Sequence, residues 1–478
     1  MGNDADEKRT LTRKPTQAFC CVGVSNRCSC ASCTDLTVYF PAFNKAKEDL
    51  FDKDTNPNGY IPMCVAENRV MRDELEAKFR EVFRDLSEMD KFPRTDLFDY
   101  GSWTGTHEMK EAVVKAVTGY LAPPTAIADI VGCHKGVDIP LIAEDVLCVT
   151  NGCGPAINLL AFGLADRSGK ECFLSTTPGY PVFATDCGLQ AGVPVVSTVK
   201  TSIDTGFAIS ISALEKAYGD CVADGYHPRA LITVNPGNPT GSVATGEELR
   251  AVRTWCADKD MWWISDEIYA CGTHNDSPRP HVSALNLPLL EGDRDPATIV
   301  LWGFSKDLGL SGMRLGFGLT LPRQRGSDCV ATLEHASDKL YGMFCAVSPV
   351  AQLFCARLLG DTEWLGTFFD RYRERLTACK IILCEGLTKL GIPYFKPYGA
   401  IFLWADLSEF TGTSSRADFD LFDTLQSDPY RLVVTPGSCF FSDKPGMVRL
   451  CYAWMSEGEE ACKEVIRRLS TFVADHRR

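Results

Sequence analysis

The chain has 478 residues, enough for one large α/β domain with a smaller companion. Its 45% hydrophobic and 23% charged residues are typical of a globular protein and exclude a disordered or fibrous chain. The formal net charge of −13 argues against nucleic acid or an anionic membrane surface as the main partner, because both bind clustered Lys and Arg.

The N-terminal residues and the cysteines indicate the compartment. The first residues lack the apolar core of a signal peptide, and no apolar run is long enough to span a membrane, so we expect a cytoplasmic protein without a membrane segment. Most of the 22 cysteines stand singly in apolar segments, which predicts reduced thiols. The exception is a cluster in the tail, formed by Cys20, Cys21, Cys28, Cys30 and Cys33. We expect an irregular tail without a metal, because no second CxxC and no nearby His supply further ligands.

From residue 71 onward the pattern predicts a large domain. Apolar residues recur at helical spacing from Met71 to Leu86, which predicts a surface helix. Seven short apolar runs then alternate with helical segments, at residues 145–150, 171–176, 194–199, 229–234, 261–265, 298–304 and 314–321. Such runs are typical of strands buried on both faces. The predicted fold class is α/β, with a mostly parallel seven-stranded sheet.

The C-terminal region predicts a smaller α+β domain. After about Tyr341 the helices become longer, and strand candidates lie at residues 400–407, 431–437 and 447–454. Ser456 followed by Glu459 predicts a capping box at the start of the last helix. The predicted units are an irregular tail (1–35), an arm contributing to the small domain (36–70), the large domain (71–340) and the small domain (341–478).

Four of the apolar runs end in residues suited to a cofactor site, and ligands bind beyond the carboxyl ends of parallel strands. The run 145–150 leads to Gly152, Cys153 and Gly154 at a helix start, where backbone amides favour a phosphate. A tight turn alone explains that segment equally well. The run 229–234 leads to NPGNPTG, which displays Asn238 on a rigid loop, although such a loop also occurs for purely structural reasons.

The other two runs bring charged groups to the same edge. Asp266 follows the run 261–265, with Tyr269 three residues later. A buried Asp needs a cation or donor, which a protonated pyridine nitrogen supplies; a salt bridge or a helix cap is the alternative. The run 298–304 leads to Ser305 and Lys306, with Arg314 eight residues further on. A Lys at the end of a buried strand loses its proton readily and acts as a nucleophile, and Arg binds phosphate bidentately.

The segments NPGNPTG, SDEIY and SKDLGLSGMRLGF together resemble the fold-type I pyridoxal 5′-phosphate (PLP) enzymes of the aspartate aminotransferase family, class I/II. The chain is most similar to the 1-aminocyclopropane-1-carboxylate (ACC) synthase-like branch, through CVAENRVM, TTPGYPVF, GAIFLWADLS and TPGSCFFSDKPGMVRLCYA. The similarity runs from about Asn58 to the last helix. It implies PLP as the cofactor, a PLP-dependent transferase-like fold, an α-amino acid as substrate and a homodimer.

The resemblance also implies roles for the catalytic residues. Lys306 would bind the cofactor covalently and move the proton at the substrate Cα. Asp266 would pair with the pyridine nitrogen, which makes the ring a better electron sink. Asn238 and Tyr269 would donate to the phenolic oxygen, and Tyr180 would stack on the ring.

Further roles concern the phosphate and the substrate. The phosphate-binding residues implied by the resemblance are Gly152, Cys153, Gly154, Ser305, Arg314 and, from the second subunit, Tyr100. Arg449 would bind the substrate α-carboxylate, with Asn238 beside it, although a buried Arg also occurs as a packing residue. Glu67 matches the acid near the substrate side chain in ACC synthases, and its alternative role is an acid preceding the helix at Met71.

Two departures from the family pattern remove hydroxyls from the expected phosphate site. Gly303 stands where the family often has Ser, and the loop NGCGP lacks a second hydroxyl. Three functions stay open: transamination with a 2-oxo acid, ACC synthase or carbon–sulfur lyase activity, and an inactive PLP-fold binding protein. The presence of Lys306, Asp266 and Arg449 argues against the inactive protein.

Overall fold

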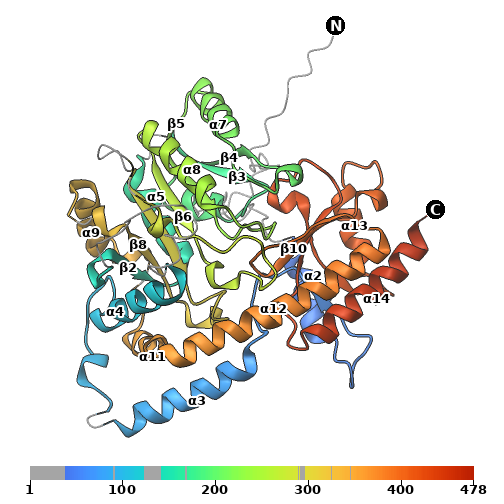
Figure 1. Ribbon diagram of the computed structural model, residues 1–478, viewed down its shortest axis with the longest axis horizontal. Coiled ribbons are helices and arrows are strands. Elements are labelled where there is room, and N and C mark those ends of the chain that lie inside the picture. Colours follow the sequence, from blue (N-terminus) through green and yellow to red (C-terminus); the bar gives the residue numbers. More distant parts are fainter. Residues whose placement is uncertain are drawn as a thin grey trace, which may run out of the picture.

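The computed structural model describes residues 38–89, 92–122, 141–166, 169–288, 290, 296–324, 326–344 and 346–477. The cysteine-rich tail predicted at residues 1–35 lies outside the described residues. Two main sheets organise the chain, a large one towards the left of Figure 1 and a small one towards the right.

The large sheet has seven strands: β2 (Val146–Thr150), β3 (Glu171–Thr177), β4 (Val195–Lys200), β5 (His227–Val234), β6 (Trp262–Asp266), β7 (Thr298–Gly303) and β8 (Gly316–Thr320). Their spatial order is β2-β8-β7-β6-β5-β3-β4. Strand β8 is antiparallel to β2 and β7, whereas the other neighbouring pairs are parallel. The predicted α/β class with a mostly parallel seven-stranded sheet is confirmed.

Strand β8 is antiparallel because of the short connection that precedes it. A parallel strand would need a long crossover, usually through a helix. Between β7 and β8 the chain forms only a single 3-10 turn, η7 (Ser311–Met313), and the Phe304 N–H donates to the Leu315 carbonyl at 3.0 Å. This connection carries Lys306 and Arg314, so it holds both residues at the carboxyl end of β7.

Both faces of the large sheet are buried. Along β7, Ile299 and Leu301 pack in one apolar cluster, whereas Val300 and Trp302 pack in another on the opposite face. This alternation follows from the two-residue repeat of a strand and explains why the run is apolar throughout. The helices of this part of the chain are α3 (Arg72–Glu88), α4 (His107–Ala116), α5 (Cys153–Leu164), α6 (Phe183–Gly188), α7 (Ile211–Ala223), α8 (Gly246–Asp258), α9 (Asp328–Lys339), α10 (Tyr341–Phe344) and α11 (Pro349–Gly360).

Helix α3 is the surface helix predicted from Met71. Leu75, Val82 and Leu86 are buried, and Phe83 is exposed. These three apolar residues, spaced seven and four positions apart, define the side that faces the core.

The small sheet is antiparallel and contains β12 (Thr435–Pro436), β13 (Met447–Cys451), β10 (Phe402–Asp406) and β9 (Tyr394–Phe395) in that order. Strand β1 (Ile61–Pro62) pairs in parallel with β11 (Leu432–Val433), so the arm joins the C-terminal region. The predicted strand at 431–437 is thus divided between two sheets. The helices are α2 (Phe40–Glu48), α12 (Thr362–Leu390), α13 (Ala417–Gln426) and α14 (Glu459–His476). In Figure 1, α12 extends from below the large sheet to the small one, where it lies beside α14. The domain boundaries themselves stay a prediction.

The capping box predicted at the last helix is wrong. Helix α14 begins at Glu459, and its N-cap is Gly458, with φ of 50° and no side-chain cap. The Gly458 N–H donates to the Met455 carbonyl at 3.2 Å, so a turn separates Ser456 from the helix. Glu459 and Glu460 instead place negative charge in the first turn, where it stabilises the helix dipole.

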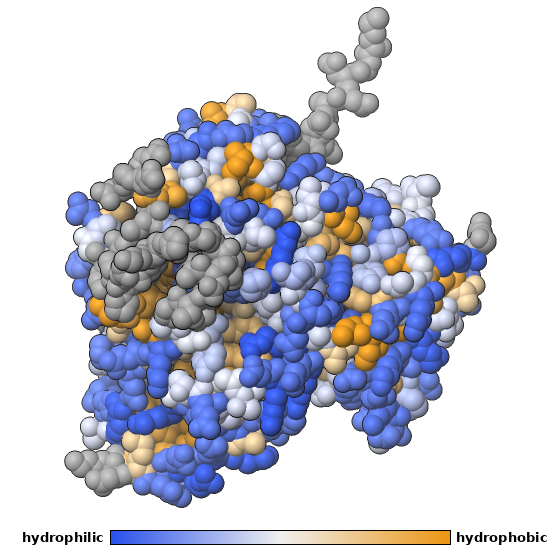
Figure 2. Space-filling view, in the orientation of Figure 1, coloured by the Kyte–Doolittle hydropathy of each residue, from blue (hydrophilic) through white to orange (hydrophobic). Residues whose placement is uncertain are grey.

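The surface and the cysteines agree with the composition. The face seen in Figure 2 is mainly hydrophilic, with apolar side chains in separate patches. The described cysteines are free thiols and most are buried. Among the described residues, no helix has the length and apolar character needed to cross a membrane, and no group of three or more His, Cys, Asp or Glu could hold a metal ion.

Candidate active site

Lys306 lies three residues beyond β7 and is held at both its backbone and its side chain. Its Nζ donates to the Ala66 carbonyl, and its own carbonyl accepts a hydrogen bond of 2.8 Å from Asn68 Nδ2. Burial lowers the pKa of the Lys306 ammonium, although the charge of Glu67 acts in the opposite direction. The lowered pKa favours the neutral, nucleophilic amine.

Asp266 is the last residue of β6, beside β7, and its side chain is 6% exposed. Its Oδ1 accepts a hydrogen bond from the Ile268 N–H at 3.2 Å. Burial raises the pKa of the Asp266 carboxyl to about 7, whereas the Ile268 hydrogen bond and the charge of Lys306 lower it. No ion pair joins Asp266 to a cation in the described part of the chain, so this buried carboxyl is suited to a positively charged ligand.

Arg449 lies on β13 and is 3% exposed. Its Nη1 donates to Asn238 Oδ1 at 2.9 Å and its Nη2 to the Cys64 carbonyl at 2.6 Å. The rings of Phe402 and Phe440 flank the guanidinium, each with its centroid 4.7 Å away. Within the described ranges, Nε has no hydrogen-bond partner and no carboxylate pairs with the charge. A buried guanidinium without a counter-ion is suited to an anionic ligand.

The start of α5 is arranged for close approach of an anion. Gly152 is the N-cap, with φ of +93°, a left-handed conformation that glycine adopts easily. A Cβ atom at Gly152 would lie 2.6 Å from Arg314 Nη2, and one at Gly316 would lie 2.6 Å from the Cys153 nitrogen. Arg314 donates from Nη2 to the Asn151 carbonyl at 3.1 Å, so its guanidinium lies against the helix start. The start of a helix and this charge together favour a phosphate.

The structure gives a reason for the first departure from the family pattern, the glycine at position 303. A Cβ atom there would lie 2.7 Å from the Leu315 carbonyl oxygen and 2.9 Å from the Gly316 Cα, so a serine would collide with backbone. At the second departure, Cys153 Sγ donates to the Trp302 carbonyl at 3.4 Å and therefore points towards β7.

Two tyrosines predicted for the site lie near Asp266. Burial raises the pKa of both Tyr180 and Tyr269, and the charge of Asp266 adds to the increase for each. The Tyr269 ring packs edge-on against Phe402, with the centroids 5.0 Å apart. This contact links the end of β6 to the small sheet that carries Arg449.

Glu67 lies one residue beyond Ala66, whose carbonyl accepts from Lys306, but its carboxylate is engaged elsewhere. Glu67 Oε2 accepts from Arg69 Nε at 3.1 Å and lies 3.0 Å from Arg69 Nη2. The Arg69 guanidinium in turn lies over the Trp454 ring, 3.9 Å from its centroid. The structure therefore places Glu67 near Lys306, but the Glu67 carboxylate is paired with Arg69.

Tyr100 lies apart from the residues above. It is 92% exposed and contacts Trp103, with ring centroids 5.2 Å apart. Ser305 precedes Lys306, and its carbonyl accepts from Ser311 Oγ at 3.0 Å. Within one chain, the structure brings together the other predicted site residues but not Tyr100.

Sequence reasoning missed four contributors to the site. Asn68 donates to the Lys306 carbonyl, and the Cys64 carbonyl accepts from Arg449. Both residues belong to the segment CVAENRVM, in which only Glu67 was singled out. Burial raises the pKa of Asp186 to about 6, and its Oδ2 would lie 3.2 Å from a Cβ at Gly154. Tyr39 is also close, since burial raises the pKa of its hydroxyl while the charge of Arg449 lowers it.

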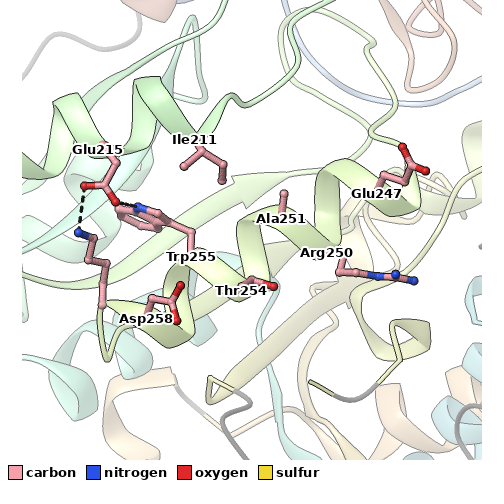
Figure 3. A pocket seen from close by; sticks show the side chains of 9 residues that line it. Ile211, Glu215, Glu247, Arg250, Ala251, Thr254, Trp255 and Asp258 are labelled. Atoms are coloured by element: carbon pink, nitrogen blue, oxygen red, sulfur yellow. Dashed lines mark hydrogen bonds and ion pairs between the residues drawn. The ribbon is translucent and has the colours of Figure 1, made fainter. Parts of the chain in front are cut away.

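A separate hollow of about 620 Å³ lies between α7 and α8 (Figure 3). Glu215 bridges it, accepting from Trp255 Nε1 at 2.8 Å and from Lys259 Nζ at 2.9 Å. None of the predicted site residues lines this hollow, and its Glu215 carboxylate is paired with Lys259. We therefore place the active site at the carboxyl ends of β6 and β7 and not here.

Residues 68–469 match the family model described as "Aminotransferase class I and II". Among curated proteins, 1-aminocyclopropane-1-carboxylate synthase 6 of Oryza sativa subsp. japonica is 28% identical over 444 residues, which are 93% of this chain and 78% of that protein. A probable aminotransferase of Arabidopsis thaliana is 28% identical over 435 residues, with coverage of 90% and 82%. These relatives confirm the predicted closeness to ACC synthases.

Solved structures agree on the fold. A tyrosine aminotransferase from Leishmania infantum has a TM-score of 0.71 at 18% identity, covering 96% of this chain and 100% of its own. A mutant aspartate aminotransferase from Thermus thermophilus has a TM-score of 0.69 at 21% identity, covering 94% and 99%. With the family model spanning most of the chain, the protein belongs to the class I and II aminotransferases and is a PLP-dependent enzyme of fold type I.

Proposed function

We propose that this enzyme transfers the amino group of an α-amino acid to a 2-oxo acid, with PLP bound where β6 and β7 end. The observation that carries the proposal is the convergence of three charged groups that lack counter-ions in the described chain: the buried Asp266 and Arg449, and the half-buried Lys306. Such groups are costly unless a ligand completes them.

The residues at this edge fit the cofactor. Asp266 would meet the protonated ring nitrogen, and Lys306 would bind the cofactor covalently. Tyr180 would stack on the ring, while Tyr269 and the amide group of Asn238 would donate to the phenolic oxygen. The phosphate-binding residues would be Gly152, Cys153, Gly154, Ser305 and Arg314. When bound, PLP supplies an electron sink that acidifies the substrate Cα–H bond.

We assign the transfer of the proton at the substrate Cα to Lys306. Burial lowers the pKa of its ammonium, which favours the neutral amine, the form that accepts a proton. The Asn68 hydrogen bond to the Lys306 carbonyl fixes the backbone of the lysine. Within the described residues, the Nζ is held by a single hydrogen bond, to the Ala66 carbonyl, which it can exchange for a contact with the substrate.

Arg449 is assigned to the substrate α-carboxylate. Its unpartnered Nε supplies one donor, and an Nη group supplies the second of a bidentate pair. Asn238 holds Nη1 in place through its Oδ1, which leaves its amide group as a donor. The substrate would thus be oriented by the same loop that contacts the cofactor.

The Glu67–Arg69 ion pair favours transamination over ACC synthesis. A cationic sulfonium side chain, as in S-adenosylmethionine, would be attracted by a free carboxylate near Lys306. Here Arg69 neutralises that carboxylate. The proximity of Glu67 to Lys306 keeps a lyase or ACC synthase as the second candidate, since opening the pair would free the acid.

The proposed assembly is a cytoplasmic homodimer. The exposed Tyr100 supports it, because a hydroxyl so far from its own site is available to the phosphate of a second copy.

Product analysis tests the reaction. The purified enzyme is incubated with a panel of amino acids plus 2-oxoglutarate, and separately with S-adenosylmethionine. We expect a 2-oxo acid from the amino acid and no ACC. Formation of ACC and methylthioadenosine without amino transfer would replace the proposal with the second candidate, and a colourless protein without either product would support a binding protein.

A variant sharpens this test. Arg69→Gln removes the cation that pairs with Glu67, so we expect it to raise turnover of S-adenosylmethionine relative to that of the preferred amino acid. Arg72→Gln, an exposed change on α3, is the matched control and should leave the ratio unchanged.

A further inference from the structure

Asp307, directly after Lys306, is a buried acid that none of the roles above uses. Its Oδ2 accepts two hydrogen bonds, from Trp302 Nε1 at 2.9 Å and from the Cys271 N–H at 3.0 Å. Trp302 lies on β7, and Cys271 lies in the 3-10 turn η5 (Ala270–Gly272), which begins one residue after Tyr269. One oxygen therefore ties the chain at Lys306 to the strand before it and to the turn that follows Tyr269.

The second oxygen of Asp307 faces a tyrosine of α12. Within the described part of the chain, neither Asp307 Oδ1 nor the Tyr372 hydroxyl has a hydrogen-bond partner, and both side chains are fully buried. A Cβ atom at Gly272 would lie 3.1 Å from the Tyr372 hydroxyl and 3.6 Å from Asp307 Oδ1. The missing side chain at Gly272 thus leaves a space that both groups border, and the hydroxyl is the donor available to the carboxylate.

The surroundings make the ionisation of Asp307 sensitive to these donors. Burial raises the pKa of Asp307 to about 7, while the hydrogen bonds from Cys271 and Trp302 and the charge of His281 lower it. The groups that face it are the Cys271 thiol, the Trp302 indole and the Tyr372 hydroxyl. Hydrogen-bond donors of β7 and η5 are therefore arranged around a carboxylate next to the proposed catalytic lysine.

Lys306 is consequently held from two sides. Asn68 holds its carbonyl, and Asp307 anchors the next residue to β7 and η5. A small displacement of Lys306 would change its distance both to Asp266 and to the substrate Cα, and misplacement of a catalytic group by about 1 Å costs roughly 10²-fold in rate.

We propose that Asp307 is a positioning residue, which fixes Lys306 against the turn that follows Tyr269, and that the Tyr372 hydroxyl of α12 borders its second oxygen as the donor within reach once either side chain shifts. The inference rests on the proposed function of Lys306 and extends it to a residue that does not touch substrate or cofactor. Through Tyr372, the placement of α12 is coupled to the geometry of the catalytic lysine.

Asp307→Asn and Tyr372→Phe test this inference. For Asp307→Asn we expect PLP still to bind, kcat to fall about 10²-fold, KM to change little and the pH midpoint of the cofactor absorbance to move by about one unit. Tyr372→Phe should move the midpoint in the same direction by less. Because the midpoint reports the environment of Lys306, general loss of stability would not move it.

Asp145→Asn is the matched control. Asp145 is also fully buried and accepts a backbone hydrogen bond, from the Ile142 N–H at 2.8 Å, but it precedes β2 at the opposite end of the sheet. Its variant should change stability and leave the midpoint unchanged.

The outcomes separate this inference from the proposed function. If borohydride fixes PLP to Lys306 of the unaltered protein but Asp307→Asn keeps its midpoint and loses activity only with its folded fraction, the positioning role is overturned. If Asp307→Asn does not fold, Tyr372→Phe decides: an unchanged midpoint refutes the role and a shifted one supports it. Failure of the unaltered protein to bind PLP through Lys306 would instead refute the proposed function.

Discussion

Two buried arginines of the C-terminal region differ in how their charge is balanced. Arg468 on α14 is 2% exposed, and its Nε donates to Glu464 at 2.7 Å while its other nitrogens donate to backbone carbonyls, among them that of Gly59 at 2.8 Å. Arg449, almost as deeply buried, pairs with no carboxylate in the described chain, and its Nε is unpartnered. Burying an unpaired charge costs several kcal/mol. The fold thus supplies Arg468 with a counter-ion and hydrogen-bond acceptors, whereas Arg449 is suited to an anionic ligand.

The same contrast holds for two lysines. Lys380 on α12 is fully buried and forms an ion pair with Asp276. Lys306 donates only to a carbonyl, and burial lowers the pKa of its ammonium. In both pairs, the charge that lies away from the candidate site is neutralised by a carboxylate of the fold, whereas the charge at the edge where β6 and β7 end is not.

The largest expected effect is that of Lys306→Ala. Loss of the group that moves the Cα proton should lower kcat by about 10³-fold or more, with little loss of stability, because the lysine has no counter-ion to leave unpaired. Borohydride should no longer fix PLP to the protein, which mass spectrometry of peptides can check. Lys380→Met is the counterpart: it removes the buried partner of Asp276, which keeps its ion pair with Lys396 at 3.3 Å. It should destabilise by about 1–2 kcal/mol and leave the activity of folded molecules unchanged. Similar behaviour of the two variants would contradict the comparison.

The arginines should divide in the same way. Arg449→Ala removes the proposed carboxylate ligand and should lower kcat/KM by about 10²-fold, since losing a buried charge-assisted contact costs roughly 2–5 kcal/mol. Arg468→Ala should instead lower the midpoint of urea unfolding and spare kcat/KM of the folded fraction. A large fall in kcat/KM for Arg468→Ala, measured well below its unfolding midpoint, would show that the two arginines are not functionally distinct.

Asp266 gives a pH-dependent form of the comparison. Its pKa is raised to about 7, so without cofactor the folded chain binds more protons than the unfolded chain between about pH 4 and pH 7. The free energy of unfolding therefore falls as pH rises through this window, and the full cost is present above pH 7. Asp266→Asn removes the charge and should stabilise the cofactor-free protein at pH 8 by about 2 kcal/mol.

Urea unfolding of the cofactor-free protein at pH 5 and pH 8 measures this effect. Asp307 and Asp186 also have a raised pKa, so only the difference between variant and unaltered protein is assigned to Asp266. The affinity for PLP should fall in the same variant. A variant less stable than the unaltered protein at pH 8 would refute the idea that Asp266 lacks a cation partner.

The sequence predicted the parts of the site that follow from local pattern. A continuous apolar run predicts a strand buried on both faces, and the polar residue after it must then lie at the carboxyl edge. Lys306, Asp266 and Asn238 were found in this way, and the resemblance added Arg449 and Tyr180. Asn68 was missed, because its contact joins residues 238 positions apart and no local pattern encodes it. Asp307 was missed because a carboxyl next to the lysine reads as an ordinary polar residue until its burial is seen.

The failed capping box shows the limit of a local motif. Ser456 and Glu459 have the right spacing, but the turn that ends at Gly458 makes the helix begin at Glu459, so the serine lies outside it. The positive φ of a glycine cannot be read from a four-residue motif.

A smaller effect is expected at Gly303, the first departure from the family pattern. A serine there would bring its Cβ within 2.7 Å of the Leu315 carbonyl, which must then move. We expect Gly303→Ser to destabilise by about 1–3 kcal/mol and to gain no affinity for PLP. Thermal unfolding and a PLP titration decide this, and tighter PLP binding would indicate that the phosphate site accepts the family's hydroxyl after all.

The smallest effect is expected at Tyr100, the predicted site residue that lies apart from the others within one chain. Its side chain is exposed and packs little within its own chain, so the proposed role of its hydroxyl depends on a second copy of the chain. Tyr100→Phe should weaken PLP binding about tenfold through loss of one hydrogen bond to a charged group, without changing the stability of the monomer. Tyr218→Phe on α7 is the control. Because the hydroxyl would come from the partner, the difference between the two variants should vanish when the unaltered protein and the variants are diluted until sedimentation shows monomers. A persistent difference in the monomer would place the tyrosine within its own site.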